Sequence, residues 1–246
     1  MDGSLLKIVG VPHRVRLSGF RPVVIATDES SVKRNLEYES AKTGDVAAAK
    51  RLAADLTNRT ALDQIRLLIA GRKPDLVPVH ALESQGHNRI PAAFAELLAE
   101  RLDLEVETGI VQANVVNHTG ASGWARLARP AVFDGVVVPG REYVLVDDFV
   151  GQGGTLANLR GYLIFSGGDV LGATTLTGRA DSATLELELQ TLEGLKAKHG
   201  NEIESWWIQS FGYGFDCLTQ SEARYLLRAE NADTIRKRLI EAGSEE

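Results

Sequence analysis

The sequence predicts an α/β fold in which a mainly parallel sheet is flanked by helices. Two observations lead to this expectation. From residue 75 onward, short apolar runs alternate with helix-like segments, and this alternation is typical of parallel sheets because a crossover helix connects successive strands. The chain has 246 residues, of which 44% are hydrophobic, so it can bury the core of one domain or of two small ones.

The chain divides into three predicted segments. Residues 1–74 are expected to form an N-terminal flank or cap, residues 75–210 a core of about five strands with helices on both faces, and residues 211–246 a C-terminal helical flank. Both chain ends then contribute to a cap or hood over the core.

Helix boundaries follow from capping residues, glycines and prolines. Asp45 is a typical N-cap for the alanine-rich segment after it, Gly71 closes the next helix, and Pro91 is tolerated in a first turn. The predicted helices are 46–56, 61–70, 90–101, 155–165, 183–198, 219–229 and 231–242.

Strands are predicted where short apolar runs stand between turn residues. The Asp134-Gly135 step between apolar residues also indicates a hairpin within 131–138. The right-handed crossover rule places the loops that follow parallel strands on one edge of the sheet, where ligands bind. The predicted strands are 22–26, 75–79, 104–111, 143–146, 170–176 and 205–209.

Composition excludes several classes of function. A net charge of −6 argues against a dedicated nucleic-acid-binding surface. Cys217 is the single cysteine, so no intrachain disulfide forms, and no Cys/His cluster has zinc spacing. No apolar run approaches the ~18 residues of a membrane span. We therefore expect a cytoplasmic protein without a membrane partner.

The segment 143–156 carries the most chemical information. An apolar strand runs into two adjacent carboxylates, Asp147 and Asp148, and the small-residue loop 151–154 leads to Thr155. Paired carboxylates at a strand end accept hydrogen bonds from vicinal hydroxyls or hold hydrated Mg²⁺. Glycines let backbone N–H groups approach a phosphate, and the helix N-terminus favours its charge. These residues indicate a sugar phosphate site.

Two other phosphate motifs fail on spacing. A P-loop requires a lysine after its last glycine, and none is present. A dinucleotide fingerprint starting at Gly151 requires a small residue at position 156, which is Leu. A tight strand-to-helix turn with an acidic cap stays open as a purely structural alternative.

The stretch VLVDDFVGQGGTL (144–156) resembles the 5-phosphoribosyl 1-diphosphate (PRPP) binding motif of type I phosphoribosyltransferases. The resemblance implies that family's α/β fold, with Asp147 and Asp148 on the ribose hydroxyls and Mg²⁺ held indirectly by these acids through PRPP or water. The residues that it assigns to the 5′-phosphate are Gly151, Gln152, Gly153, Gly154 and Thr155.

The motif departs from the family pattern at two positions. Purine-type members place a base-facing aspartate where this chain has Gly151, which argues against a hypoxanthine/guanine-type activity. Gln152 stands where a hydroxyl residue is frequent; its amide can still donate to phosphate.

An upstream stretch, 75–102, resembles the diphosphate loop and helix of the competence-associated, amidophosphoribosyltransferase-like branch. There a Pro-Val strand leads to a polar loop that ends in Gly-x-Asn, matched here by Gly86, His87 and Asn88. With Arg89, these residues supply the backbone donors and the cation that a diphosphate requires. A solvated connector is the alternative.

Four further basic or imidazole side chains are candidates for the diphosphate or its surroundings. In the family, a mobile loop at 112–130 brings cations to this group; Arg126 and Arg129 are the candidates here, with His118 third. Arg179, at the end of the strand 171–179, is a candidate near the diphosphate or the acceptor base. Ordinary surface arginines are the alternative in each case.

The aromatic block 205–227 lies outside the resemblance. It is predicted to pack in the core, to form a contact in a homodimer, or to serve as a hood that selects the acceptor. Cys217 within it has no partner motif for a catalytic thiol.

Together these features predict a magnesium-dependent phosphoribosyltransferase of nucleotide metabolism. Its partners would be PRPP and a small nitrogenous acceptor, with diphosphate as the leaving group. Two alternatives remain: a PRPP- or nucleotide-sensing regulator without turnover, and an accessory protein of nucleic-acid processing.

Overall fold

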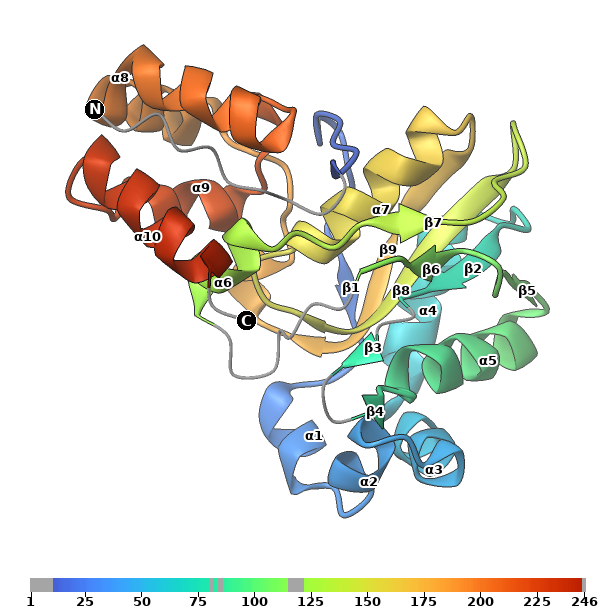
Figure 1. Cartoon of the computed structure of the whole chain (residues 1–246). Coiled ribbons are helices and arrows are strands. Elements are labelled where there is room, and N and C mark those ends of the chain that lie inside the picture. Colours follow the sequence, from blue (N-terminus) through green and yellow to red (C-terminus); the bar gives the residue numbers. More distant parts are fainter. Residues whose placement is uncertain (1–10, 80–81, 84–85, 115–121, 245–246) are drawn as a thin grey trace.

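The central sheet of the protein is fully parallel. The computed structural model describes residues 11–79, 82–83, 86–114 and 122–244. Five strands pair in parallel in the order β1-β9-β8-β2-β5 (Figure 1), which confirms the predicted α/β class. These strands are β1 (Val24–Ile25), β9 (Asp169–Gly178), β8 (Glu142–Val150), β2 (Asp75–Pro78) and β5 (Glu105–Val106).

Helices cover both faces of this sheet. Helices α3 (Val46–Leu56), α4 (Arg59–Ile69) and α5 (Ile90–Leu102) bury one face, and α7 (Gly154–Phe165) packs on the other (Figure 1). The alternation of strand side chains explains this arrangement: Val144 and Val146 of β8 belong to the first core cluster, whereas Tyr143 and Leu145 belong to the second. A strand buried on both faces therefore reads as a continuous apolar run.

A third core cluster is purely helical and stands beside the sheet (Figure 1). It forms the hood of the molecule, the name we use below for this helical unit. The hood consists of α6 (Gly123–Ala128), α8 (Leu189–Phe211), the short helix η2 (Phe215–Cys217), α9 (Gln220–Leu227) and α10 (Ala232–Ser244).

The predicted strand 205–209 is wrong, because this segment is the end of α8. Ile203, Trp207 and Phe211 are fully buried and stand four residues apart, which is a helical spacing. Trp207 packs on Phe211 with a ring-centroid distance of 4.2 Å. The fifth strand of the sheet is instead β1, from the N-terminal segment.

Two other local predictions need correction. The predicted helix 183–198 begins only at Leu189, after the short helix η1 (Ala180–Ser182). In place of a hairpin within 131–138, β7 (Phe133–Asp134) pairs antiparallel with β6 (Val111–Gln112).

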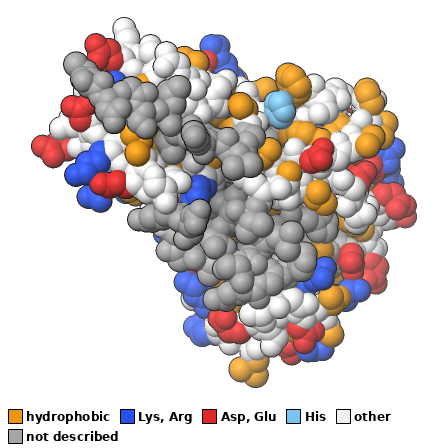
Figure 2. All heavy atoms as spheres, in the orientation of Figure 1, with side chains coloured by type: hydrophobic (Ala, Val, Ile, Leu, Met, Phe, Trp, Pro, Cys, Tyr) orange, Lys and Arg blue, Asp and Glu red, His pale blue; other side chains and the backbone are white. Residues whose placement is uncertain are grey.

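The polar N-terminal stretch that carried no element prediction contains two short helices, α1 (Glu29–Arg34) and α2 (Tyr38–Lys42). A further small ladder joins β3 (Leu82–Glu83) and β4 (Gly86–His87). Acidic and basic side chains are interspersed over the outer helices of the face seen in Figure 2. In the described part of the chain, no helix is both long and apolar enough to cross a membrane.

Candidate functional site

The two acids of the motif lie on β8 near the carboxyl edge of the sheet. The strand does not end before them but continues to Val150. Asp147 is only 7% exposed, and its Oδ1 accepts a hydrogen bond from the backbone N–H of Asp148 at 2.8 Å. Asp148 Oδ2 accepts from Asn88 Nδ2 at 2.7 Å. The two neighbouring carboxylates are thus held in place at the edge where ligands bind in parallel α/β folds.

Asn88 comes from the predicted diphosphate segment and contacts this site directly. Its Oδ1 accepts from the backbone N–H of Ile90 at 3.1 Å, so its Nδ2 is directed at Asp148. Asn88 therefore ties the start of α5 to the acids of β8. His87 lies on β4, and its side chain is outside the described residues; His118 lies outside them altogether.

The loop after β8 has the backbone geometry of an anion site. Gly153 has φ +77° and is the N-cap residue of α7, so no side chain caps the first N–H groups of this helix. Thr155 is the second residue of α7. Uncapped N–H groups at a helix N-terminus are available to a phosphate. Gly154 does not have a positive φ, although a Cβ there would come within 2.5 Å of Glu222 Oε1.

A cavity of about 350 Å³ brings most of the predicted residues together. Asp147, Asp148 and every residue of 151–155 line it. Asn88, Arg126 and Arg179 line it as well, whereas Arg89 and Arg129 are not among its lining residues. The structure thus brings the predicted phosphate, ribose and part of the predicted diphosphate residues to one place.

Arg126 and Arg179 place positive charge beside the loop 151–155, which is called the phosphate loop below after its predicted role. A Cβ on Gly151 would come within 2.6 Å of an Arg126 terminal nitrogen, so the guanidinium lies directly over the glycine backbone. Burial, and secondly the charge of Arg179, lower the pKa of Arg126. An anion bound between these two groups would relieve their repulsion.

Several cavity residues were not predicted from the sequence, among them three polar residues of the N-terminal segment. Lys33 on α1 and Tyr38 and Lys42 on α2 line the cavity from the N-terminal segment. Burial, with a contribution from the Asp148 carboxylate, raises the pKa of the Tyr38 hydroxyl. These residues lie in a polar stretch without periodicity or motif, so the sequence contains no signal that places them here.

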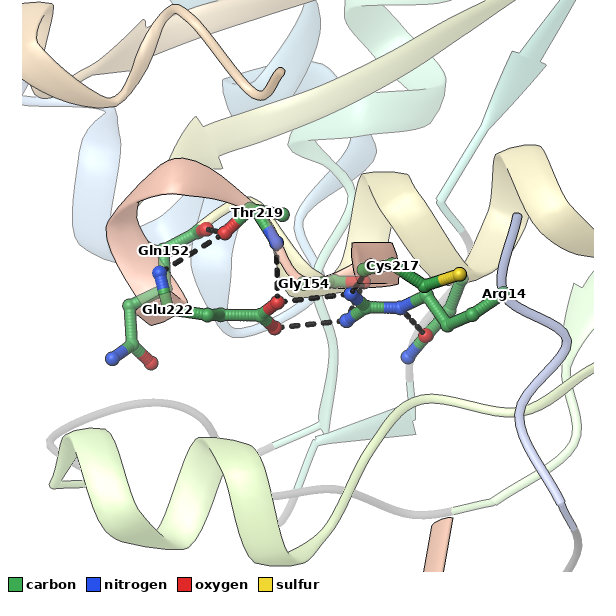
Figure 3. A network of polar contacts seen from close by, with 7 residues as sticks. Arg14, Gln152, Gly154, Cys217, Thr219 and Glu222 are labelled. Atoms are coloured by element: carbon green, nitrogen blue, oxygen red, sulfur yellow. Dashed lines mark hydrogen bonds and ion pairs between the residues drawn. The ribbon is translucent and has the colours of Figure 1, made fainter. Parts of the chain in front are cut away.

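A buried ion pair supports the phosphate loop from behind. Arg14 and Glu222 are 1% and 4% exposed in their side chains and pair with N–O distances of 2.8 and 2.9 Å. Arg14 also donates to the carbonyl oxygens of Gly154 and Cys217 and to the side chain of Asn158 on α7. Figure 3 shows the Arg14 guanidinium facing the Glu222 carboxylate beside Gly154.

The first turn of α9 completes this support. Thr219 and Glu222 form a capping box, in which each side chain accepts from the backbone N–H of the other residue. The Thr219 hydroxyl donates to the carbonyl oxygen of Gln152 at 2.6 Å (Figure 3). The phosphate loop is therefore held between the segment around Arg14 and the hood. The prediction of a hood role for the C-terminal block did not include these contacts.

Cys217 lies close to this network but has no sign of reactivity. Burial raises the pKa of its thiol to about 11, with Asp216 acting in the same direction. A thiol with that pKa stays protonated near neutral pH and is a poor nucleophile.

The acids fit the way in which proteins bind Mg²⁺ together with a phosphorylated ligand. In the described residues, no group of three His, Cys, Asp or Glu side chains could hold a metal ion by itself. Mg²⁺ usually keeps several waters and is bound through one or two carboxylates plus phosphate oxygens of the substrate. Asp147 and Asp148 match the two-carboxylate part of that donor set, and the phosphate oxygens and waters would have to supply the rest.

Comparison with known proteins gives two sequence relatives. No protein-family model matches the chain. Protein TraN of Escherichia coli is 43% identical over 233 residues, which are 95% of this chain and 52% of that protein. An uncharacterized protein of Haemophilus influenzae is 42% identical over 127 residues, covering 52% of this chain and 28% of that protein. The chain spans about half the length, or less, of these curated relatives.

The solved structures similar to the chain include phosphoribosyltransferases. An adenine phosphoribosyltransferase aligns with a TM-score of 0.35 and 16% identity, covering 61% of this chain and 75% of that chain. UMP synthase of Leishmania donovani aligns with a TM-score of 0.32 and 15% identity, covering 74% of this chain and 33% of that one. Alignments at these scores carry no argument about activity, so the functional proposal rests on the site itself.

Proposed function

We propose that this chain binds PRPP with Mg²⁺ and transfers phosphoribose to, or from, a nitrogenous acceptor. The observation that carries the proposal is the shared cavity of Asp147, Asp148 and the loop 151–155. Paired carboxylates and an uncapped helix N-terminus beside one another match a ribose 5-phosphate, which has vicinal hydroxyls near a phosphate. We include in this proposal that the chain is a type I phosphoribosyltransferase of the competence-associated, amidophosphoribosyltransferase-like branch.

In the proposed reaction, a nitrogen of the acceptor forms a bond to C1 of the ribose while the bond from C1 to the diphosphate oxygen breaks. The diphosphate leaves with the bonding electrons, and the acceptor nitrogen transfers its proton to the departing diphosphate or to water. Asp147 and Asp148 hold the ribose hydroxyls, and the N–H groups of 152–155 hold the 5′-phosphate. Arg126 and Arg179 stabilise negative charge on the leaving group, so the protein acts by positioning and electrostatics.

Mg²⁺, when bound, neutralises charge on the diphosphate and thereby makes it a better leaving group. Asp147 and Asp148 would hold it through PRPP oxygens or water. Asn88 fixes one oxygen of Asp148 by hydrogen bonding, which leaves the other oxygen for a hydroxyl or a metal-bound water.

A second candidate function is sensing of PRPP without turnover. It is favoured by the pairing of the other acids that line the cavity. Among the residues that the structure describes, the acids that line it besides Asp147 and Asp148 are Glu29 and Glu222. Glu29 pairs with Lys33 and Glu222 with Arg14. Neither of these two is free to act as a general base, which suits a protein that holds PRPP but transfers nothing, or an acceptor that needs no base.

Replacing the acids tests the ligand assignment. We expect Asp147→Asn and Asp148→Asn each to weaken PRPP·Mg²⁺ binding by about tenfold or more, because a hydrogen bond to a charged group contributes roughly 1.5–3 kcal/mol. Binding is measured by isothermal titration calorimetry. The melting temperature without ligand should change little, since Asn retains an acceptor oxygen for the Asp148 N–H and for Asn88 Nδ2.

Diphosphate release with a panel of nucleobases and amines then separates the two functions. Release that depends on one acceptor and is lost in both variants supports transfer, whereas tight binding without release supports sensing. If both variants bind PRPP as the wild type does, the acids are structural and the assignment fails.

A further inference from the structure

A second cavity, of about 260 Å³, adjoins the first at the phosphate loop. Gly151 and Gln152 line both cavities, as do Arg126 and Arg179. The second cavity is therefore contiguous with the first at this loop. Its remaining walls come from the hood and from the segment after β9.

Four arginines dominate the charge of this second cavity. Arg126 comes from α6, Arg179 follows β9, and Arg224 and Arg228 come from the end of α9. In the described part of the chain, Asp181 is the one acidic residue that lines it. Four guanidinium groups against one carboxylate leave a local excess of positive charge in a protein whose net charge is −6.

The ion pair that Arg224 forms neutralises little of that residue's charge. Arg224 lies 3.6 Å from Glu188, and both side chains are about half exposed, at 44% and 58%. An exposed pair of this kind contributes ~1 kcal/mol or less. A phosphate, which accepts two parallel hydrogen bonds from a guanidinium, can replace it.

The walls of this arginine cavity are packed against one another. The hydroxyls of Ser182 and Ser221 hydrogen-bond at 3.0 Å and so join η1 to α9. A Cβ on Gly123 would come within 2.4 Å of the Tyr225 ring, so α6 lies directly on α9. The arginines that line this cavity, of which Arg179, Arg224 and Arg228 are exposed, thus extend from backbone that is held in place, which favours a preorganised anion site.

We propose that the arginine cavity binds a second phosphate group, separate from the one at residues 151–155. The ligand class is a phosphomonoester, supplied by inorganic phosphate or by a nucleoside 5′-monophosphate. Because the two cavities adjoin at Gly151 and Gln152, a phosphorylated acceptor or product can occupy this site while ribose 5-phosphate occupies the other. Binding of phosphate here does not depend on PRPP transfer.

Arginine modification by a dicarbonyl reagent, mapped by peptide mass spectrometry, tests this proposal on the whole chain. Saturating inorganic phosphate or AMP should slow modification of Arg224 and Arg228 several-fold. Arg59 and Arg101, which lie on α4 and α5 outside both cavities, should be modified at unchanged rates. Protection by inorganic phosphate shows that the phosphate group alone is enough for binding. Stronger protection by AMP shows that the nucleoside part contributes to binding as well.

A charge-matched pair of variants completes the test. In the Asp147→Asn/Asp148→Asn background, which weakens binding of a ribose 5-phosphate at the first cavity, Arg224→Gln/Arg228→Gln should lower AMP affinity at least tenfold, whereas Arg59→Gln/Arg101→Gln should leave it unchanged. In Asp147→Asn/Asp148→Asn, protection of Arg224 and Arg228 should persist even though PRPP binding is lost, which keeps this proposal distinct from the proposed function. Equal AMP affinity in all variants, or no protection by either ligand, overturns it.

Discussion

Replacing Gly153 with valine will abolish PRPP-dependent stabilisation of the protein. Gly153 has φ +77°, and a Cβ there would lie 2.4 Å from Leu185 Cδ2. A left-handed conformation costs a residue with a Cβ about 1–2 kcal/mol, and more for a β-branched side chain. The Leu185 methyl group can shift aside, but relief of the left-handed backbone requires the loop itself to move, and the N–H groups at the start of α7 then lose their common direction. The melting temperature with and without PRPP·Mg²⁺ measures the effect.

Gly71→Val is the matched control for this substitution. Gly71 has the same φ of +77° at the end of α4, but nothing lies within 4 Å of a Cβ placed there. This variant should lose stability and still show the full PRPP-dependent shift. Gln152→Thr, which restores a hydroxyl, should preserve or increase the shift. A PRPP-dependent shift that survives in Gly153→Val would mean that the loop is only a turn.

Removing the charge of Arg14 will destabilise the protein by about 3–5 kcal/mol, because Arg14→Met leaves the Glu222 carboxylate buried without its partner. Both side chains are almost completely buried, and Arg14 joins Gly154, Asn158 and Cys217. Urea denaturation measures the change in the free energy of unfolding. We also expect weaker PRPP binding, since Gly154 belongs to the phosphate loop.

Arg16→Met provides the control two residues away. Arg16 pairs with Asp216 at 2.6 Å, but its side chain is 75% exposed, so its loss should cost ~1 kcal/mol or less. The double variant Arg14→Met/Glu222→Leu should recover part of the loss of the single variant because no unpaired charge remains. If Arg14→Met and Arg16→Met are equally stable, the buried pair does not support the loop.

Sequence patterns predicted the sheet and the glycine-rich turn into α7 because both depend on neighbouring residues. The apolar run of β8 is buried on both faces, and the glycines after it stand where the backbone turns into α7. The strand expected at 205–209 failed for a different reason. A short apolar and aromatic run fits either periodicity, and contacts with distant helices of the hood decided in favour of a helix.

The other site residues are brought together by contacts between segments far apart in the sequence, and such contacts leave no local sequence pattern. Arg14 and Glu222 are 208 residues apart in the chain, yet they form an ion pair beside Gly154 of the loop 151–155. Lys33 and Tyr38 lie in a stretch without periodicity and reach the cavity only because α1 and α2 lie beside the carboxyl edge of the sheet. A single sequence carries no signal for such pairs.

A crystal structure of the chain with PRPP and Mg²⁺ tests the central claim most directly. The account predicts the 5′-phosphate within hydrogen-bonding distance of the backbone N–H groups of 152–155, and the ribose hydroxyls on the carboxylates of Asp147 and Asp148. Ordered PRPP bound elsewhere, or an empty loop in crystals soaked at saturating PRPP, would contradict the account.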